Sequence, residues 1–302
     1  DRPELHDVVR EWRAVLDEYE DKVMVAEAWI PSWPRLAMYV RPDEYHQTFA
    51  FQFLRAPWDP EAMRSTIHDA LAATGSVGSL PTWVLSNHDV MRQVTRYGLA
   101  DDVDERAWLL DGDPSSFDYE LGLRRARAAA LLMLALPGSV YLYQGEELGL
   151  PEVSDLPEGV IDDPVWERSG KTEKGRDGCR VPIPWTSEGD SFGFGANGSW
   201  LPQPDQWSEL SVESQRGDDG STLELYRNAI RIRSALLRHD EELEWMDLGT
   251  DVVAFARGGA MTCVVNFGTD PIPVPDGEVV LISAPMSNGL LPGNSAAWIV
   301  SS

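Results

Sequence analysis

The chain alternates helix-like segments with short apolar strands, and this alternation limits the folds open to it. Residues 3–20 place apolar side chains at a 3.6-residue period, which predicts a helix with one buried face. Val23–Ala26 follow as a continuous apolar run, the pattern of a strand covered on both sides in a parallel sheet. The unit recurs as helices at 60–73 and 119–136 and as strands at Thr82–Leu85 and Ser139–Tyr143, with a further strand candidate at Thr48–Phe53. The alternation predicts an α/β fold built on a parallel sheet with right-handed crossovers.

The remainder of the chain has a different character. Residues 151–205 are rich in Pro, Gly and Trp without clear periodicity, and a long irregular stretch is usually a functional lid or binding loop. Ser221–Glu224 (STLE) is a capping-box pattern that begins a helix. Later come short alternating strands, clearest at Met261–Phe267, separated by Gly and Pro turns. We therefore expect two domains: an α/β domain over 1–240, with an active-site loop at 151–205, and a small antiparallel β-sandwich over 241–302.

Charge and cysteine content narrow the class of partner. The formal net charge is −25, and an acidic surface repels phosphate, so nucleic acid is not an expected partner. Apolar runs stay well short of about 18 residues, so no membrane-spanning helix is expected. Cys179 and Cys263 lie far apart and fit no metal-binding spacing. They favour two reduced thiols in a cytoplasmic protein.

Two carboxylates stand where predicted strands end. Glu27 directly follows the strand Val23–Ala26, and Asp89 follows Thr82–Leu85 by four residues. Barrels of alternating strands and helices keep their chemistry at the carboxyl ends of the strands. Cleavage of a glycoside needs a proton donor for the leaving oxygen and negative charge facing an oxocarbenium-like transition state. The apolar neighbours of Glu27, such as Trp29, are expected to favour its protonated form.

The order of several motifs resembles one family. Val25–Trp29 (VAEAW) resembles the strand-five motif of the α-amylase family of glycoside hydrolases, which holds the general acid. Leu85–Asp89 (LSNHD) resembles the strand-seven motif, which ends in the Asp that stabilises the transition state. Later segments are similar to the α-glucosidase and oligo-1,6-glucosidase branch: Tyr141–Gly149, Gly175–Trp185, Val264–Phe267 and Leu291–Trp298. The resemblance covers essentially the whole chain.

The resemblance implies a role for each matching residue. Glu27 would be the general acid and later the base that activates water, and Asp89 would hydrogen-bond the sugar at the cleaved unit. His88 would contact the same sugar, with a core histidine as the alternative. Arg180 would lie near the acceptor-side sugar, with a structural ion pair as an equally acceptable interpretation. No metal ligand and no cofactor are expected among these residues.

One departure from the family pattern concerns the nucleophile. In the family it is an Asp on strand four, in a segment upstream of the strand-five motif, and no such segment lies among the residues before Val23. The resemblance therefore implies the carboxyl-terminal half of a (β/α)₈ barrel followed by the β-sandwich. The amino-terminal half of the same enzyme would be the partner, and any calcium site would lie there. The chain alone would be inactive.

The implied reaction of the complete enzyme is hydrolysis of α-glucosidic bonds with retention of configuration. The long loop at 151–205 favours short oligosaccharides or disaccharides as substrates. Two alternatives stay open at this point. A transglucosidase or sugar isomerase of the same family would pass the glucosyl unit to a sugar hydroxyl instead of water. A non-catalytic family member, such as a transporter-associated ectodomain, fits less well because Glu27, His88 and Asp89 are all present.

Overall fold

Four short parallel strands stand side by side in chain order in the computed structural model, which describes residues 2–237 and 243–301. They are β1 (Val25–Ala26), β2 (Gln47–Thr48), β3 (Thr82–Trp83) and β4 (Ser139–Val140). β1 pairs with β2 and β3 with β4, while a parallel bridge from Phe49 to Thr82 joins the two pairs. Chain-order parallel pairing is the strand arrangement of an α/β barrel, as the alternation predicted.

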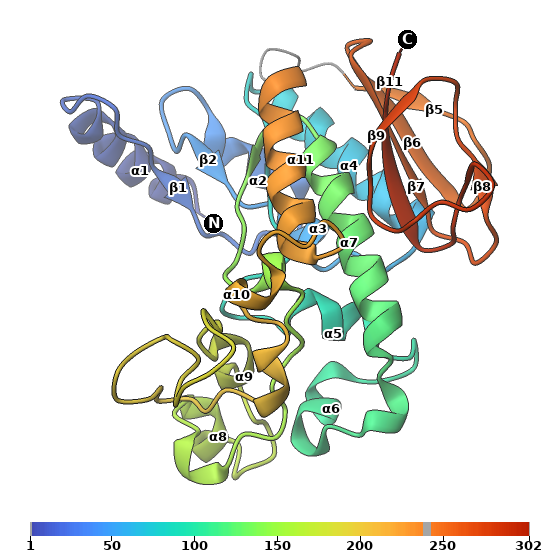
Figure 1. The fold of residues 1–302 in the computed structure, drawn as a ribbon. Helices are drawn as coiled ribbons and strands as arrows, with labels where there is room; N and C mark the ends of the chain where they lie inside the picture. The colour runs from blue at the N-terminus through green and yellow to red at the C-terminus, as the bar shows by residue number, and fades with distance from the viewer. Residues whose placement is uncertain (1, 238–242, 302) are drawn as a thin grey trace.

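Long helices connect and cover these strands (Figure 1). They are α1 (Pro3–Leu16), α4 (Pro60–Gly75), α7 (Tyr119–Ala135) and α11 (Thr222–Leu236). The N-caps match their sequence signals: Asp59 accepts from the amide of Ala62, Asp118 from that of Leu121, and Ser221 from that of Glu224. In α7 the run from Ala128 to Ala135 is wholly buried. The predicted helices at 60–73 and 119–136 are thus present with almost the expected bounds.

Helix α1 differs from the prediction in the environment of its apolar face. Of this helix only His6 and Val9 are buried. Apart from the half-buried Leu16, its other large apolar side chains are exposed, and Trp12 retains 52% of its accessible surface. In Figure 1 the helix lies at the side of the molecule, away from the carboxyl-terminal sheet. The face that the 3.6-residue period defines therefore has no covering layer among the described residues.

A five-stranded antiparallel sheet forms the carboxyl-terminal part, in the order β5 (Glu244–Met246), β6 (Val252–Arg257), β7 (Met261–Asn266), β11 (Ser295–Val300), β9 (Glu278–Ile282). A smaller pair, β8 (Ile272–Pro273) and β10 (Leu290–Leu291), lies against one of its faces. The other face packs on α7, where the indole of Trp298 donates to the carbonyl of Leu131 at 3.1 Å. The expected antiparallel sheet is confirmed. The expected domain boundary at 240–241 falls outside the described residues.

Shorter helices shape the loops that follow the parallel strands. They are α2 (Trp33–Ala37), α3 (Phe51–Leu54), α5 (Gln93–Gly98), α6 (Glu105–Asp111), α8 (Pro164–Arg168), α9 (Asp177–Arg180) and α10 (Val212–Gln215), with 3-10 turns η1 (Met38–Val40), η2 (Pro114–Ser116), η3 (Glu146–Leu148), η4 (Glu158–Val160) and η5 (Asp205–Ser208). Over the described residues no helix combines the length and the apolar character needed to cross a bilayer.

Two expectations need correction. The strand candidate at Thr48–Phe53 is a strand only at Thr48, because the chain then turns into α3 and buries Phe53 against Trp83, with ring centroids 5.1 Å apart. The loop at 151–205 is not structureless. It contains α8 and α9, and its apolar residues, including Val181, pack around Trp207 in a cluster of their own. This cluster gives the lid a fixed shape.

Candidate active site

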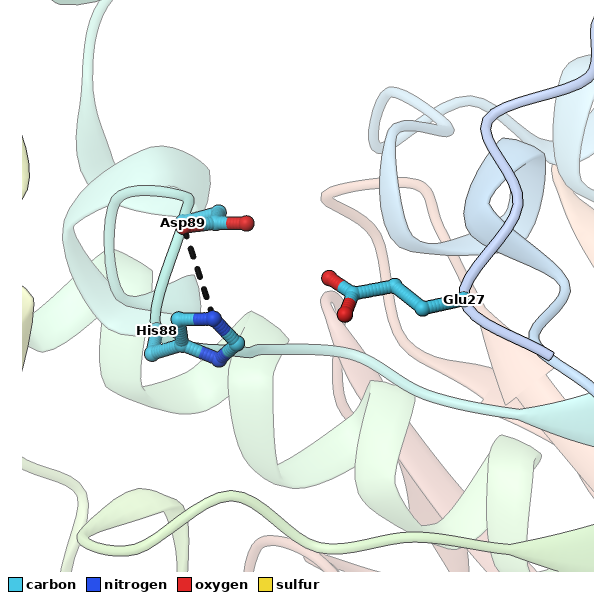
Figure 2. Close-up of side chains that lie close together, drawn as sticks. All are labelled: Glu27, His88 and Asp89. Carbon is cyan, nitrogen blue, oxygen red and sulfur yellow. Dashed lines mark ion pairs between the residues drawn. The ribbon is translucent and has the colours of Figure 1, made fainter. Parts of the chain in front are cut away.

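Glu27, His88 and Asp89 converge at the carboxyl ends of the parallel strands. Glu27 directly follows β1, and His88 and Asp89 lie on the turn that follows β3. One ligand atom from each, a carboxylate oxygen or a ring nitrogen, lies within 4.8 Å of the other two. Figure 2 shows the Glu27 carboxyl reaching across towards the other two side chains. Parallel strands end at one edge of a sheet, so residues 61 positions apart in the sequence meet in one place.

The Asp89 carboxylate is held on one oxygen by cations. Its Oδ1 accepts from Nη1 of Arg176 at 2.8 Å and from Nη2 of Arg180 at 3.3 Å. Nε2 of His88 lies 3.5 Å from the same oxygen. The structure therefore brings together all four residues that the sequence singled out: Glu27, His88, Asp89 and Arg180. Arg180 also forms the ion pair that was its alternative interpretation, and its partner is Asp89.

Sequence reasoning missed Arg176. It belongs to the same short segment as Arg180, at the other end of α9, and that spacing was the signal available. Its Nε donates to Oδ2 of Asp163 at 2.5 Å while Nη1 reaches Asp89. The hydrogen bonds to Asp163 and then to Asp89 raise the pKa of Arg176 above its ordinary value. Burial alone would raise the pKa of Asp163, but the bond from Arg176 and the amide donors hold it below its usual range.

The turn that carries His88 and Asp89 is fixed by the backbone. Oδ1 of Asn87 accepts from the amide of Asp89 at 2.8 Å, and Nε of Arg180 donates to the carbonyl of His88 at 2.9 Å. Asn87 thus makes a structural hydrogen bond within the turn. These two contacts fix the backbone of the turn from which the His88 and Asp89 side chains project.

A hollow of about 200 Å³ separates Glu27 from the ends of β3 and β4. Its wall is largely apolar and includes aromatic rings such as that of Tyr141. Trp29 stacks on Phe51 with ring centroids 4.1 Å apart and an angle of 13° between the planes. Flat apolar walls beside a few polar groups suit the face of a sugar ring. Glu27 itself is exposed, so these residues do not supply the apolar enclosure that the sequence led us to expect.

A larger, more polar cavity of about 420 Å³ lies beside Asp89, between α6 and α8. Arginine and carboxylate side chains alternate around it, and most of them are paired. Nη1 of Arg55 lies 3.2 Å from Glu105, and Nη1 of Arg106 lies 3.8 Å from Glu173. The cavity therefore presents a polar wall of nearly balanced charge next to the residues of the site.

Glu27, His88 and Asp89 are also close enough to share a cation. A hard divalent ion prefers several oxygen ligands, whereas this cluster offers two carboxylates and one imidazole. Two guanidinium groups already neutralise Asp89. The donor set therefore fits a resident metal poorly, and we route no chemistry through one.

Two further carboxyls lie buried behind the site. Burial raises the pKa of Glu146 to about 8, although the amide of Tyr143 donates to this carboxyl and lowers it. Burial likewise raises the pKa of Glu152 to about 7, against the hydrogen bond and the charge of Arg92. Both acids are structural, because their hydrogen bonds go to the backbone around the site.

Carboxylates that meet at the carboxyl ends of parallel strands are the arrangement of a class of protein, the α/β-barrel enzymes. Comparison with known proteins agrees with this class. Residues 1–240 match the family model described as "Alpha amylase, catalytic domain". The chain belongs to the α-amylase family.

Individual relatives place the chain more closely within the family. It is 33% identical over 263 residues to a probable alpha-glucosidase of Rhizobium meliloti, covering 85% of this chain and 43% of that protein. It is 26% identical to a salivary alpha-glucosidase of Anopheles gambiae, covering 91% and 45%. Among solved structures, an alpha-glucosyl transfer enzyme superposes over 100% of this chain and 55% of that chain, with a TM-score of 0.79 and 29% identity. The chain thus spans about half the length of the curated relatives it matches.

The buried acids predict how stability depends on pH. A glutamate with an ordinary pKa of 4.5 and a folded pKa of about 8 holds a proton in the folded state that the unfolded chain has released. The free energy of unfolding should therefore fall as pH rises from about 5 to about 8. Glu146→Gln, a neutral isostere, should remove more than about 1 kcal/mol of this fall, as measured by urea unfolding across the range.

The matched control for this measurement is Glu120→Gln, which alters an exposed carboxylate at the start of α7. It should leave the slope of stability against pH unchanged. An unchanged slope in Glu146→Gln would show that Glu146 is ionised in the folded protein.

Proposed function

We propose that this chain supplies the proton donor and the transition-state-stabilising carboxylate of an α-glucosidase that works with retention of configuration. The observation that carries the proposal is the approach of Glu27 and Asp89. They come from separate strands, yet their carboxyls meet within 4.8 Å of each other and of His88. The similarity to proteins named alpha-glucosidase supports the same substrate linkage.

Each residue then has a step to perform. The protonated Glu27 gives its proton to the glycosidic oxygen as the bond from that oxygen to the anomeric carbon breaks. Asp89, with His88 beside it, hydrogen-bonds the hydroxyls of the glucosyl unit and faces the positive charge that develops on the ring. Arg180 lies towards the leaving-group sugar. Once the glucosyl unit is bound covalently, the Glu27 carboxylate takes a proton from the water that releases it.

The covalent nucleophile must be a different carboxylate. Asp89 is a poor candidate, because two guanidinium groups and His88 occupy its Oδ1 and stabilise the anion. A carboxylate neutralised in this way serves as an electrostatic partner better than as an attacking group. We therefore assign the nucleophile to a segment outside these 302 residues, in the amino-terminal half of the same enzyme.

The open surfaces of the chain support this half-barrel assignment. β1 and β4 are the outer strands of the parallel series, and within residues 2–237 and 243–301 neither has a partner on its outer side. Closure into a barrel removes such edges. The uncovered apolar side chains of α1 (Leu5, Val8, Trp12 and Val15), with Tyr19 just after the helix, form a face of the kind that packs against barrel strands. The missing half of the barrel would cover both.

Several finer points complete the proposal. The fixed shape of the lid favours a pocket for short oligosaccharides or disaccharides over an open cleft for polymers. Cys179 and Cys263 are both buried and free, which suits the reducing environment of the cytoplasm, where we place the enzyme. No cofactor is assigned to these residues, and a calcium site would belong to the other half.

A transglucosidase is the second candidate. One observation favours it: the superposition with the alpha-glucosyl transfer enzyme covers the whole chain at 29% identity. Both reactions share the glucosyl-enzyme step and differ only in whether water or a sugar hydroxyl attacks it. Chromatography of the products formed from maltose separates them, because hydrolysis gives glucose alone and transfer gives longer or isomeric glucosides.

The general-acid role of Glu27 predicts a dependence on the leaving group. In the complete enzyme, Glu27→Gln should lower glucosylation of maltose by about 1000-fold, because the leaving sugar then departs without a proton. A nitrophenyl α-glucoside should lose far less in the same step, since nitrophenolate departs readily without protonation. Single-turnover kinetics measure that step directly.

Glu18→Gln, in the exposed turn after α1, is the matched control and should leave both substrates unaffected. Equal losses of glucosylation for maltose and the nitrophenyl glucoside in Glu27→Gln would exclude Glu27 as the proton donor.

The half-barrel assignment predicts that this chain associates with the amino-terminal half of the enzyme. Expressed alone, the chain should aggregate or dimerise through its open edges and show no α-glucosidase activity. Co-expression with the amino-terminal half should give a soluble, active enzyme. Trp12→Glu, on the uncovered face of α1, should weaken this association at least about tenfold, whereas Glu11→Gln on its exposed polar side should not. Size-exclusion chromatography and titration of activity measure both effects.

A soluble monomer of this chain that hydrolyses a nitrophenyl α-glucoside would contradict the half-barrel assignment and the placement of the nucleophile together.

A further inference from the structure

A buried arginine links the strand ends to the lid. Arg92 lies three residues after Asp89, retains only 3% of its accessible surface, and does not line the hollow beside Glu27. Its Nη1 donates to the carbonyl of Gln144 at 2.8 Å, just beyond β4. Its Nη2 donates to the carbonyl of Val181 at 3.1 Å, directly after α9. One guanidinium therefore joins the loop after β3, the loop after β4 and the lid.

Two aromatic rings hold this guanidinium in place. Its central carbon lies 5.6 Å from the ring centroid of Tyr143 and 5.6 Å from that of Trp207. Trp207 is fully buried in the apolar cluster of the lid. A planar, delocalised cation packs on ring faces better than an ammonium does, and it can donate to two separate carbonyls at fixed directions. The side chain therefore fixes both distance and orientation between the loops that it joins.

Glu152 also connects Arg92 to α9. Its Oε2 accepts from the amide of Arg92 at 2.9 Å, and its own amide donates to Oγ1 of Thr95 at 2.8 Å. α9 lies directly on this carboxyl, because a Cβ added at Gly178 would come within 2.3 Å of the other oxygen, Oε1. Only glycine permits this approach, which sets the height of α9 above the buried pair.

α9 carries the two arginines that hold Asp89. Tyr143, whose ring packs on the Arg92 guanidinium, donates from its hydroxyl to the carbonyl of Cys179 at 3.0 Å. α9 is therefore fixed at Gly178, Cys179 and Val181, all through Arg92 or a group in contact with it. Arg176 precedes this helix and Arg180 ends it, and both reach the same oxygen of Asp89.

We propose that Arg92 is a positioning residue of the reaction: with Glu152 it places α9 so that Arg176 and Arg180 hold Asp89 in its working orientation. It acts through these residues and contacts no substrate. The expected effect of Arg92 on the reaction rate rests on the proposed function. The placement of the lid by Arg92 does not depend on it. A residue whose loss shifts a reacting group by about 1 Å can cost about 100-fold in rate.

The test compares the buried Arg92 with the half-buried Arg127. Arg92→Met keeps the length and apolar stem of the side chain and removes the guanidinium. Arg127→Met is the matched control, because Arg127 also joins distant segments, the Ser283 carbonyl at 2.9 Å and the Thr222 hydroxyl at 3.0 Å, but lies away from the lid. Both variants should lose stability. Only Arg92→Met should raise amide hydrogen exchange in residues 178–183, by about tenfold.

The kinetic measurement separates positioning from folding. In the complete enzyme, Arg92→Met should lower kcat about 10- to 100-fold and change KM less than about threefold, because Asp89 acts mainly in the transition state. Millimolar guanidinium ion should restore part of the kcat of Arg92→Ala and none of that of Arg127→Ala. Should these variants fail to fold, Arg92→Lys keeps the charge and cannot reach both carbonyls, so it should show the same lid exchange and a smaller loss of kcat.

The exchange and kinetic measurements test the two parts of the proposal separately. The exchange measurement needs only folded protein, so it tests the placement of the lid by Arg92 even if the enzyme is not an α-glucosidase. In that case the wild-type enzyme shows no hydrolysis, while amide exchange in the lid still rises in Arg92→Met. If the wild type is active and Arg92→Met or Arg92→Lys matches Arg127→Met in lid exchange and in kcat, Arg92 is a stability residue and the proposal is wrong.

Discussion

The burial of α7 is the packing on which the rest of the structure depends. The small side chains of its alanines allow neighbouring elements to approach closely, and its leucines fill the space between the parallel strands and the carboxyl-terminal sheet. The indole of Trp298 donates across this interface to the backbone of α7, and Nη1 of Arg257 reaches the carbonyl of Ala135. Because the same helix serves both layers, the sheet is an integral support for the strands that carry the site.

The site is formed by ion pairs between arginine and carboxylate side chains more than by an apolar enclosure around them. Glu27 stands exposed at one side, while Asp89 on the other is fixed by Arg176, Arg180 and His88. The two acids thus have different environments: Glu27 is exposed, whereas Asp89 accepts hydrogen bonds from two guanidinium groups. Within the described residues Glu27 has no apolar enclosure that would shield it from water.

The loop at 151–205 has packing of its own beside the site. Its apolar cluster around Trp207 gives it a core, and Arg92 and Glu152 anchor that core to the loops after β3 and β4. The buried carboxyls Glu146 and Glu152 have raised pKa values because the same tight packing excludes water around them. Burying acids is unfavourable for folding, and the protein tolerates it where the carboxyl oxygens fix backbone amides next to the site. The buried carboxyls thus lower the stability of the folded protein while they fix the backbone next to the site.

The sequence by itself determined the helix and strand alternation, the family, and the identity of Glu27, His88, Asp89 and Arg180, because these depend on local periodicity and on short motifs. Only the tertiary structure decided three other matters. It turned the predicted strand before Phe53 into a helix, since burial against Trp83 outweighs local β propensity. It showed that the apolar face of α1 lies open, because periodicity defines a face without saying what covers it. It brought Arg176 and Arg92 into the network around Asp89, through contacts between segments that lie far apart in the sequence.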